Sequence, residues 1–260
     1  MNNLNLKSIT EDLLETFLSA GKIAKEISER GVKITIKSDN SPVTDGDLAV
    51  DNFLKKRISN LTPNISIISE ESVDLSLKDK KVNNNFWLID PIDGTRDYIK
   101  KREEYTLNAA LIINYEPVIG IIYAPAKDRL FYSYGENLAY EINKGKKVIL
   151  NGKKKNENEI IGLENSGSTP SEVLKIYKNH GVTLKNKMSS SLKFCILAAG
   201  EADIYAANAR AYEWDIAAGH AILKHAGGSI TTHDKKKFLY GKDNYKNLPI
   251  IALRSNNLEK

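Results

Sequence analysis

Hydrophobic residues recur at helical spacing in two segments near the start of the chain. In residues 9–31 the apolar positions fall three or four residues apart, and Gly31 is a suitable residue to end such a helix. Residues 43–61 repeat the pattern, with a start near Thr44 or Asp45. We therefore expect two amphipathic helices, each with one buried face.

Apolar runs of strand length follow. ISIIS occupies residues 65–69 and FWLID occupies residues 86–90, and residues 105–143 alternate apolar runs with polar or Gly/Pro breaks, which is typical of an antiparallel meander. Further along, the pattern predicts helices at 170–179, 190–200 and 213–226, and strands near 160–163, 202–206 and 228–231. Strands that alternate with helices predict sheets covered by helices, and hence an α/β fold.

A stretch rich in Lys and Asn at residues 152–158 separates the two patterns. It fits a subdomain boundary, and it equally fits the tip of a hairpin. With the first interpretation, residues 1–151 form an N-terminal α+β subdomain and residues 152–260 form a C-terminal α/β subdomain.

Composition mainly excludes classes of protein. With 41% hydrophobic and 27% charged residues in 260, the chain can bury a sizeable core. The apolar runs are too short to span a bilayer, and one cysteine, Cys195, cannot form an internal disulfide framework or a cysteine-built zinc site. The N-terminus lacks the basic and apolar pattern of a signal peptide, so we expect a cytoplasmic protein.

The net charge of +5 comes from 38 basic and 33 acidic residues. A basic protein favours anionic partners, but these lysines are scattered along the chain. The densest runs, 153–155 and 235–237, lie in polar stretches typical of solvated loops. This distribution argues against a dedicated nucleic-acid surface.

Acidic residues stand where predicted strands end and predicted helices begin. Asp47 lies in PVTDGD, Glu70 directly follows ISIIS, Asp90 and Asp93 follow FWLI, and Asp215 lies in YEWDIAAG. Taken singly, each could be a surface charge or a helix cap. Brought together they would repel one another unless a cation were present, and oxygen ligands of this kind suit magnesium.

The compact motif DPIDGT at residues 90–95 is more specific than any single acid. Pro91 cannot continue a central strand, so the chain must turn and both aspartates can converge, with the Ile92 carbonyl as a further ligand. Gly94 and Thr95 then open a short helix whose backbone N–H groups can receive a phosphate. The motif therefore predicts metal ligands directly beside an anion site.

DPIDGT, with SEES upstream and WDIAAG downstream, resembles the inositol monophosphatase superfamily of magnesium-dependent, lithium-sensitive phosphatases. The resemblance extends from PVTDGD to the AGG at 226–228 and keeps the acidic positions in the order of the family. It implies an alternating αβαβα sandwich of the inositol monophosphatase and sugar phosphatase type. Within the superfamily, SSLKFC and YEWDIAAGHAILKHAGG are most similar to the bacterial 3′(2′),5′-bisphosphate nucleotidases.

The resemblance also implies a set of metal ligands. Glu70, Asp90 and the Ile92 carbonyl would hold a first Mg²⁺. Asp90, Asp93 and Asp215 would hold a second. A third ion could lie near Glu70.

By the same resemblance, Asp47 and Thr95 would orient or deprotonate the attacking water, with Glu70 close by. The residues expected to contact the substrate are Asp93, Gly94, Thr95, Ser190, Lys193 and Asp215. Among these, the backbone of Gly94 and Thr95 would cradle the scissile phosphate, and Ser190 and Lys193 would face the rest of the nucleotide.

One position departs from the nucleotidase pattern. Members of that branch often have an arginine shortly after the tyrosine of the strand that precedes Glu-Trp-Asp. In YAANARAYEWD this position is Ala207, and Arg210 follows three residues later. Recognition of a second phosphate is thus less well defined by the sequence than the metal site.

The expected function is the magnesium-dependent removal of the 3′-phosphate from adenosine 3′,5′-bisphosphate, or from its sulfated form. An inositol or sugar monophosphatase is the first alternative, because the same metal cage would serve it. A non-catalytic protein associated with RNA or transcription is the second, since some relatives have that role. Relatives occur as monomers and as homodimers, and the sequence does not choose between them.

Overall fold

The computed structural model describes residues 4–73, 83–154 and 159–258. Its α-helices are α1 (Leu6–Arg30), α2 (Asp45–Leu61), α3 (Thr95–Ile99), α4 (Ser171–Asn179), α5 (Leu192–Ala198) and α6 (Glu213–His225), and short 3₁₀ turns are η1 (Pro125–Lys127), η2 (Asp243–Tyr245) and η3 (Asn256–Leu258). Within these ranges no helix is both long and apolar enough to cross a membrane.

The larger sheet has seven strands in the order β3-β4-β5-β6-β7-β8-β9. Its strands are β3 (Ser66–Ser69), β4 (Asn85–Asp93), β5 (Thr106–Ile113), β6 (Glu116–Ala124), β7 (Arg129–Ser133), β8 (Ala139–Asn143) and β9 (Lys146–Ile149). β3 and β4 are parallel, and the other neighbours are antiparallel. The predicted meander over residues 105–143 is confirmed as β5 to β8.

β4 shows why the large sheet needs helices on both faces. Successive side chains of a strand point to opposite faces. Trp87 and Ile89 join the core cluster that includes α1 and α2, whereas Phe86 and Leu88 join the cluster that includes α5 and α6. The run FWLI is apolar throughout because both faces are buried.

The smaller sheet has five strands in the order β11-β10-β12-β14-β13. Its strands are β10 (Ile161–Glu164), β11 (Leu184–Lys187), β12 (Ile204–Ala207), β13 (Ser229–Thr232) and β14 (Ile250–Leu253). One face packs against the layer of α5 and α6, and Val173 and Tyr177 of α4 cover the other face at Ile204 and Leu253.

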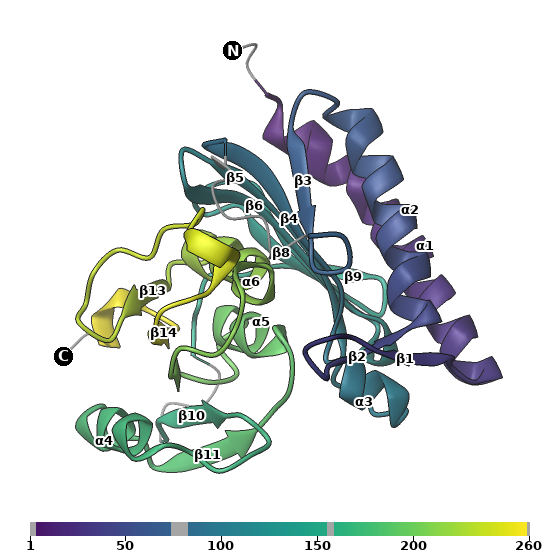
Figure 1. The fold of residues 1–260 in the computed structure, drawn as a ribbon. Helices are drawn as coiled ribbons and strands as arrows, with labels where there is room; N and C mark the ends of the chain where they lie inside the picture. Colours follow the sequence, from purple (N-terminus) through teal and green to yellow (C-terminus); the bar gives the residue numbers. More distant parts are fainter. Residues whose placement is uncertain (1–3, 74–82, 155–158, 259–260) are drawn as a thin grey trace.

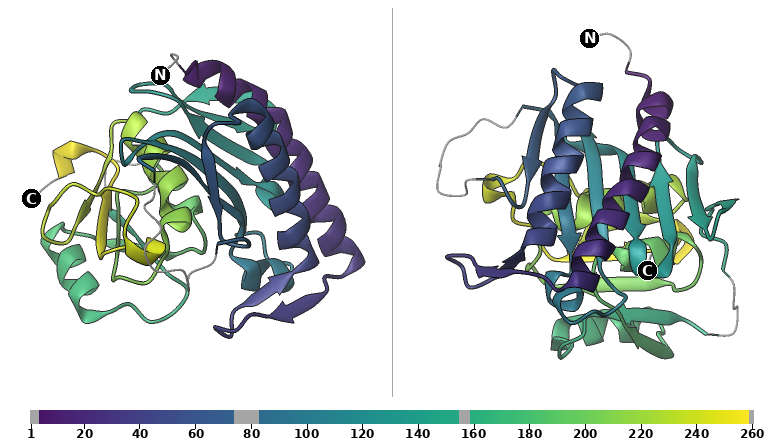
Figure 2. Two further views of the ribbon diagram at one scale, coloured as in Figure 1. Left: turned by 45° about the horizontal axis from the view of Figure 1, so that its top comes forward. Right: turned by 90° about the vertical axis from the view of Figure 1, so that its right-hand side faces the viewer.

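Figures 1 and 2 show the resulting layers: α1 and α2, the large sheet, α5 and α6, the small sheet, and α4. This is the alternating αβαβα sandwich expected from the sequence. The two sheets share one apolar core, because Leu88 and Ile112 of the large sheet belong to the same cluster as Leu197 of α5 and Ile222 of α6.

The sequence did not predict several short strands. β14 among them is buried along its whole length, and the others are mostly exposed. β1 (Ile34–Ile36) and β2 (Pro42–Thr44) form a two-stranded hairpin outside both sheets. β9 and β11 are edge strands with every residue exposed. Strands without a buried face lack the apolar alternation on which sequence-based prediction depends. Residues 155–158 of the expected subdomain boundary lie outside the described residues, and the division at 151/152 stays a prediction.

Candidate metal and phosphate site

Three carboxylates meet at one end of the large sheet. Glu70, Asp90 and Asp215 each offer an oxygen, and these atoms lie within 4.8 Å of one another. The parallel pairing of β3 and β4 aligns Ser69 with Ile89, so the next residues, Glu70 and Asp90, emerge side by side. Asp215 comes from the first turn of α6, which packs against β4, β5 and β6.

The electrostatics of this cluster indicate a cation site. Burial, followed by repulsion from neighbouring acids, raises the pKa values of Asp90 and Asp215 well above their usual range. Burial also raises the pKa of Glu70 to about 7. Asp90 Oδ1 is buried and has no hydrogen-bond partner among the described residues. A divalent cation would provide both the missing contact and the missing charge, so the donor set fits a hard metal ion.

Asp93 lies beside the cluster and is held by the protein. The prediction that Pro91 ends the strand is wrong, because β4 continues through Pro91 to Asp93. A register shift in the ladder with β5 between Asp90 and Asp93 accommodates the proline, and the chain turns only at Gly94. Asp93 Oδ2 accepts hydrogen bonds from Ser191 N and from Ser191 Oγ, both at 2.5 Å. Its pKa is raised by burial and lowered in part by these donors, with a net upward shift.

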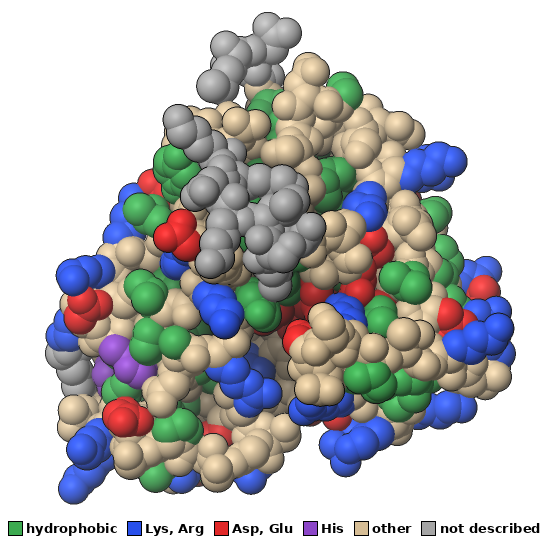
Figure 3. Space-filling model, in the orientation of Figure 1, with side chains coloured by type: hydrophobic (Ala, Val, Ile, Leu, Met, Phe, Trp, Pro, Cys, Tyr) green, Lys and Arg blue, Asp and Glu red, His purple; other side chains and the backbone are tan. Residues whose placement is uncertain are grey.

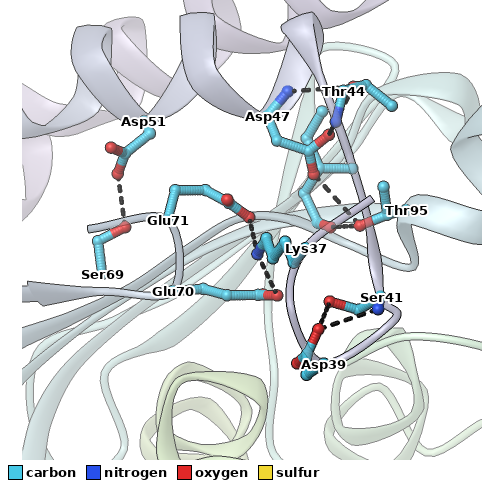
Figure 4. A network of polar contacts seen from close by, with 11 residues as sticks. Lys37, Asp39, Ser41, Thr44, Asp47, Asp51, Ser69, Glu70, Glu71 and Thr95 are labelled. Atoms are coloured by element: carbon cyan, nitrogen blue, oxygen red, sulfur yellow. Dashed lines mark hydrogen bonds and ion pairs between the residues drawn. The ribbon is translucent and has the colours of Figure 1, made fainter. Parts of the chain in front are cut away.

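Asp47 and Thr95 are in contact, although they come from different elements. Thr44 and Asp47 form a capping box at the start of α2, with Thr44 N donating to Asp47 Oδ2 at 2.8 Å. Thr95 Oγ1 lies 3.2 Å from the other oxygen, Asp47 Oδ1, and 3.1 Å from the Ile92 carbonyl oxygen. Figure 4 shows Asp47 between Thr44 and Thr95. Because Asp47 is nearly fully buried, its pKa is raised.

Gly94 permits the sharp turn between β4 and α3. Its φ of +91° lies in the left-handed region, and an added Cβ would stand 3.2 Å from the Glu104 carbonyl oxygen. Gly94 caps α3, which begins at Thr95 as the sequence predicted. Ser190 approaches from the other half of the chain, with its Cβ 3.7 Å from the position of that added atom.

Lys193 is less open to solvent than a substrate contact normally is. Its side chain is buried, and Nζ donates to the carbonyl oxygens of Met188 at 3.2 Å and Ser190 at 2.8 Å. Nζ also lies 5.1 Å from the centre of the Tyr205 ring. Burial lowers the pKa of Lys193 to about 8, so the ammonium form still predominates at neutral pH. Lys193 thus holds the backbone of the segment that carries Ser190.

Two residues at the site were missed by sequence reasoning. Lys37, in the loop of the β1–β2 hairpin, places Nζ 3.3 Å from Glu70 and 2.8 Å from Glu71, as Figure 4 shows. Burial alone would lower the pKa of Lys37, but the two carboxylates raise it overall. Ser191 is the second missed residue. Neither stands in an apolar pattern, although the run SSS at 189–191 gave a local signal that was assigned to Ser190.

The surface around the cluster combines both charges. Figure 3 shows acidic side chains gathered in the centre of one face, with Lys and Arg side chains around them. Arg210 is exposed on the segment between β12 and α6. The Lys and Arg side chains at the margin of this face would attract a negatively charged ligand, and the acidic centre would attract cations.

The model of the inositol monophosphatase family matches residues 5–257, and the chain belongs to this family. Enzymes of the family are metal-dependent phosphatases, in agreement with the acidic group described above.

Among curated proteins the chain is similar to 3′(2′),5′-bisphosphate nucleotidases named CysQ. It is 38% identical over 235 residues to CysQ of Buchnera aphidicola, covering 89% of this chain and 87% of the relative. It is 34% identical over 202 residues to CysQ of Escherichia coli, covering 77% and 79%.

Solved structures agree. CysQ from Bacteroides thetaiotaomicron superimposes with a TM-score of 0.78 at 28% identity, covering 96% of this chain and 98% of that one. An inositol monophosphatase from Anabaena gives a TM-score of 0.74 at 25% identity, covering 98% and 94%. The expected fold is therefore confirmed.

Proposed function

We propose that the protein is a magnesium-dependent 3′(2′),5′-bisphosphate nucleotidase that removes the 3′-phosphate from adenosine 3′,5′-bisphosphate, or from its sulfated form. The observation that carries this proposal is the convergence of the half-buried Glu70 and Asp215 on the buried Asp90, beside Asp93. The similarity to CysQ chains supports the nucleotide as substrate.

The proposed metal ligands are Glu70, Asp90, Asp93, Asp215 and the Ile92 carbonyl, holding two Mg²⁺ ions or three. When bound, such ions neutralise the phosphate, lower the pKa of a bound water and support the leaving oxygen. The unpartnered oxygen of Asp90 and the mutual repulsion of the acids support this assignment.

Asp47 and Thr95 are proposed to orient the attacking water. Thr95 Oγ1 can donate to Asp47 Oδ1 and at the same time accept a hydrogen bond from water. Asp47 cannot turn away, because Thr44 N holds its second carboxylate oxygen. A raised pKa makes this carboxylate a better proton acceptor than an exposed aspartate.

The substrate is proposed to span both halves of the chain. The backbone of Gly94 and Thr95 would receive the scissile phosphate. The segment with Ser190 and Lys193 would face the nucleotide, and Arg210 could contribute the positive charge that Ala207 does not.

An inositol or sugar monophosphatase is the alternative, because the same acidic cluster would serve it. The Anabaena inositol monophosphatase has the same fold. The higher identity to CysQ chains favours the nucleotidase. The presence of every expected acid argues against a purely non-catalytic RNA-binding role.

A phosphate-release panel tests the proposal. Adenosine 3′,5′-bisphosphate should give the highest kcat/KM, ahead of inositol 1-phosphate, fructose 1,6-bisphosphate and NADP. Excess chelator should abolish release, and calcium should suppress it because its longer, looser coordination misplaces the water. Asp90→Asn protein prepared in parallel controls for a contaminating phosphatase. A higher kcat/KM for inositol 1-phosphate would establish the monophosphatase instead.

A further inference from the structure

Ser191 lies at the junction between the two halves of the site. Its backbone N–H and its hydroxyl both contact Asp93 Oδ2, and the same Oγ lies 2.5 Å from the backbone carbonyl oxygen of Asp215. Asn108 Nδ2, from β5, donates to Ser191 Oγ at 3.0 Å. One side chain that is only 2% exposed thus connects β4, β5 and the first turn of α6.

The segment before Ser191 is held on several sides. Ser189 N donates to Glu104 Oε2 at 2.9 Å, and Lys193 Nζ binds the carbonyl oxygens of Met188 and Ser190. Ser190 has a φ of +55°, in the left-handed region. A left-handed residue costs free energy and persists where its surroundings determine the conformation. The result of this arrangement is that Ser191 N and Oγ point at the same carboxylate oxygen.

The acids of the site share a pattern of support. Thr44 holds one oxygen of Asp47, and Tyr212 N donates to Asp215 Oδ2 at 2.8 Å. Ser191 does the same for Asp93. For Asp93 and Asp215, engagement of one carboxylate oxygen by the protein constrains the orientation of the other oxygen, whereas both oxygens of Asp47 are engaged, Oδ1 by Thr95.

We propose that Ser191 is a positioning residue that sets Asp93 and Asp215 for a shared cation. It holds Asp93 through Oδ2, which presents Oδ1 to the cation, and it anchors the turn of α6 that carries Asp215. This inference rests on the metal dependence in the proposed function, but it does not depend on which phosphate ester is cleaved.

The hydroxyl and the backbone N–H can be separated by mutation. A hydroxyl has one proton, so Oγ donates to either Asp93 or Asp215 at a given moment. Ser191→Ala removes both of these contacts and the acceptor for Asn108, but it keeps the N–H bond to Asp93. The fold should therefore survive while the carboxylate loses part of its support.

The test is a calorimetric titration of metal-free protein with Mg²⁺, without substrate. Hydrogen-bond partners of metal ligands typically contribute 10- to 100-fold in affinity, so Ser191→Ala should weaken Mg²⁺ binding by about 10- to 100-fold. Ser191→Thr, which retains the hydroxyl, should recover much of the loss. Ser189→Ala is the matched control, because Ser189 contributes its backbone N–H to Glu104 and should bind Mg²⁺ as the wild type does.

Melting in chelator checks that each variant is folded. If Ser191→Ala does not fold, Asn108→Ala removes the donor to Ser191 Oγ together with a longer contact of Asn108 Nδ2 to Asp93 Oδ2 at 3.5 Å, and should weaken Mg²⁺ binding in the same direction. Wild-type Mg²⁺ affinity in folded Ser191→Ala, or an equal loss in Ser189→Ala, overturns the proposal. Failure to cleave adenosine 3′,5′-bisphosphate would instead contradict the proposed function and leave this result standing.

Discussion

Asp90 is surrounded by acids from four other positions, and repulsion from Glu70, Asp93, Asp215 and Asp47 adds to the effect of its burial. Buried polar groups are normally hydrogen-bonded, and an unpartnered buried carboxylate oxygen costs free energy. At the level of the residue, the metal-free site is therefore strained electrostatically, and charge removal should relieve that strain.

Asp93→Asn tests this at one position. Asparagine keeps the shape and one oxygen but removes a charge that repels Asp90. Metal-free Asp93→Asn should melt at the same temperature as the metal-free wild type or higher, added Mg²⁺ should raise its Tm less, and turnover should fall by orders of magnitude. Differential scanning fluorimetry and phosphate release measure these outcomes.

Ser191→Ala should be measured in parallel. Asp93→Asn alters the proposed metal ligand itself, whereas Ser191→Ala removes a hydrogen bond that holds this ligand. Near-normal turnover in Asp93→Asn, or a marked loss of metal-free stability, would mean that Asp93 has a structural role.

Residue-level prediction was most specific where the chemistry is contiguous in the sequence. DPIDGT places two carboxylates, a turn and a helix start within six residues, so the motif can be recognised from adjacent residues in the sequence. Ser191 and Lys37 were missed because their partners, Asp93 and Glu70, are 98 and 33 residues away. A single serine or lysine in a polar segment gives no sign of such a distant contact.

At the level of elements, the β1–β2 hairpin contributes a residue to the site although it belongs to neither of the two larger sheets. Its Ile34 and Ile36 are exposed, and its loop brings the Lys37 ammonium to Glu70 and Glu71. The amphipathic helices were predictable because each has a buried stripe. This hairpin was not predictable, because it is held by one ion-pair network and by contacts with α2 and α3.

Lys37→Met should destabilise the metal-free protein. Glu71 is nearly buried and would lose its charged partner, at a cost of about 1–2 kcal/mol for a partly screened, charge-assisted hydrogen bond. Magnesium should then restore a larger share of the stability, because the ammonium no longer competes for Glu70. Urea unfolding with chelator and with Mg²⁺ measures both effects.

Lys22→Met is the control for Lys37→Met, since Lys22 is largely exposed and its contact with Glu26 spans 4.0 Å. If both variants behave alike in chelator, Lys37 does not support the acidic cluster.

A second prediction at this level concerns Lys193, in the first turn of α5. Lys193→Met keeps the apolar stem but removes the donors to Met188 and Ser190. KM for adenosine 3′,5′-bisphosphate should rise by about tenfold, because charged hydrogen bonds contribute this much. Hydrolysis of p-nitrophenyl phosphate, which lacks the nucleotide, should change less.

Steady-state kinetics on both substrates decides the question, with the exposed Lys187→Met as control. An equal loss on the two substrates would assign Lys193 to the catalytic centre or to the fold.

At the level of the whole molecule, the acidic cluster should give the metal-free protein an unusual pH dependence. Raised pKa values mean that the folded chain binds more protons than the unfolded chain, so stability falls as pH rises. The pKa of Glu70 is raised to about 7, and the pKa values of Asp90 and Asp215 are raised well above their usual range. Burial lowers the pKa of His220 to about 3 and of His225 to about 4, which gives the opposite slope at lower pH.

The informative window therefore lies above about pH 6.5, where a histidine is mostly neutral in both the folded and the unfolded chain. Urea midpoints in chelator should fall from about pH 6.5 to about pH 7.5, below the pKa of about 8 at which Lys193 begins to contribute the opposite slope. Saturating Mg²⁺ or Asp90→Asn should reduce the slope. Midpoints in chelator that rise over this range would show that the acids are not strained in the folded protein.

A second whole-molecule prediction concerns the contact between the large sheet and the end of α5. Arg129 Nε lies 2.6 Å from Glu141, and Nη2 lies 2.8 Å from Glu201. Arg129→Met would leave the buried Glu141 charge unpaired, which should cost about 3–5 kcal/mol of unfolding free energy. Arg129→Met combined with Glu141→Leu should recover much of this. Urea unfolding measures the pair, and a double variant as unstable as the single one would contradict this account.

The proposed set of metal ligands has a consequence for the growing polypeptide. Synthesis runs from the N-terminus, so Glu70, Asp90 and Asp93 leave the ribosome well before Asp215, which follows Asp90 by 125 positions (215 minus 90). Until α6 emerges, Phe86 and Leu88 also lack the helix that covers them. A nascent chain that has not yet reached α6 therefore has three of the proposed ligands and one uncovered apolar face, so we expect hydrolysis to begin only after α6 has been made.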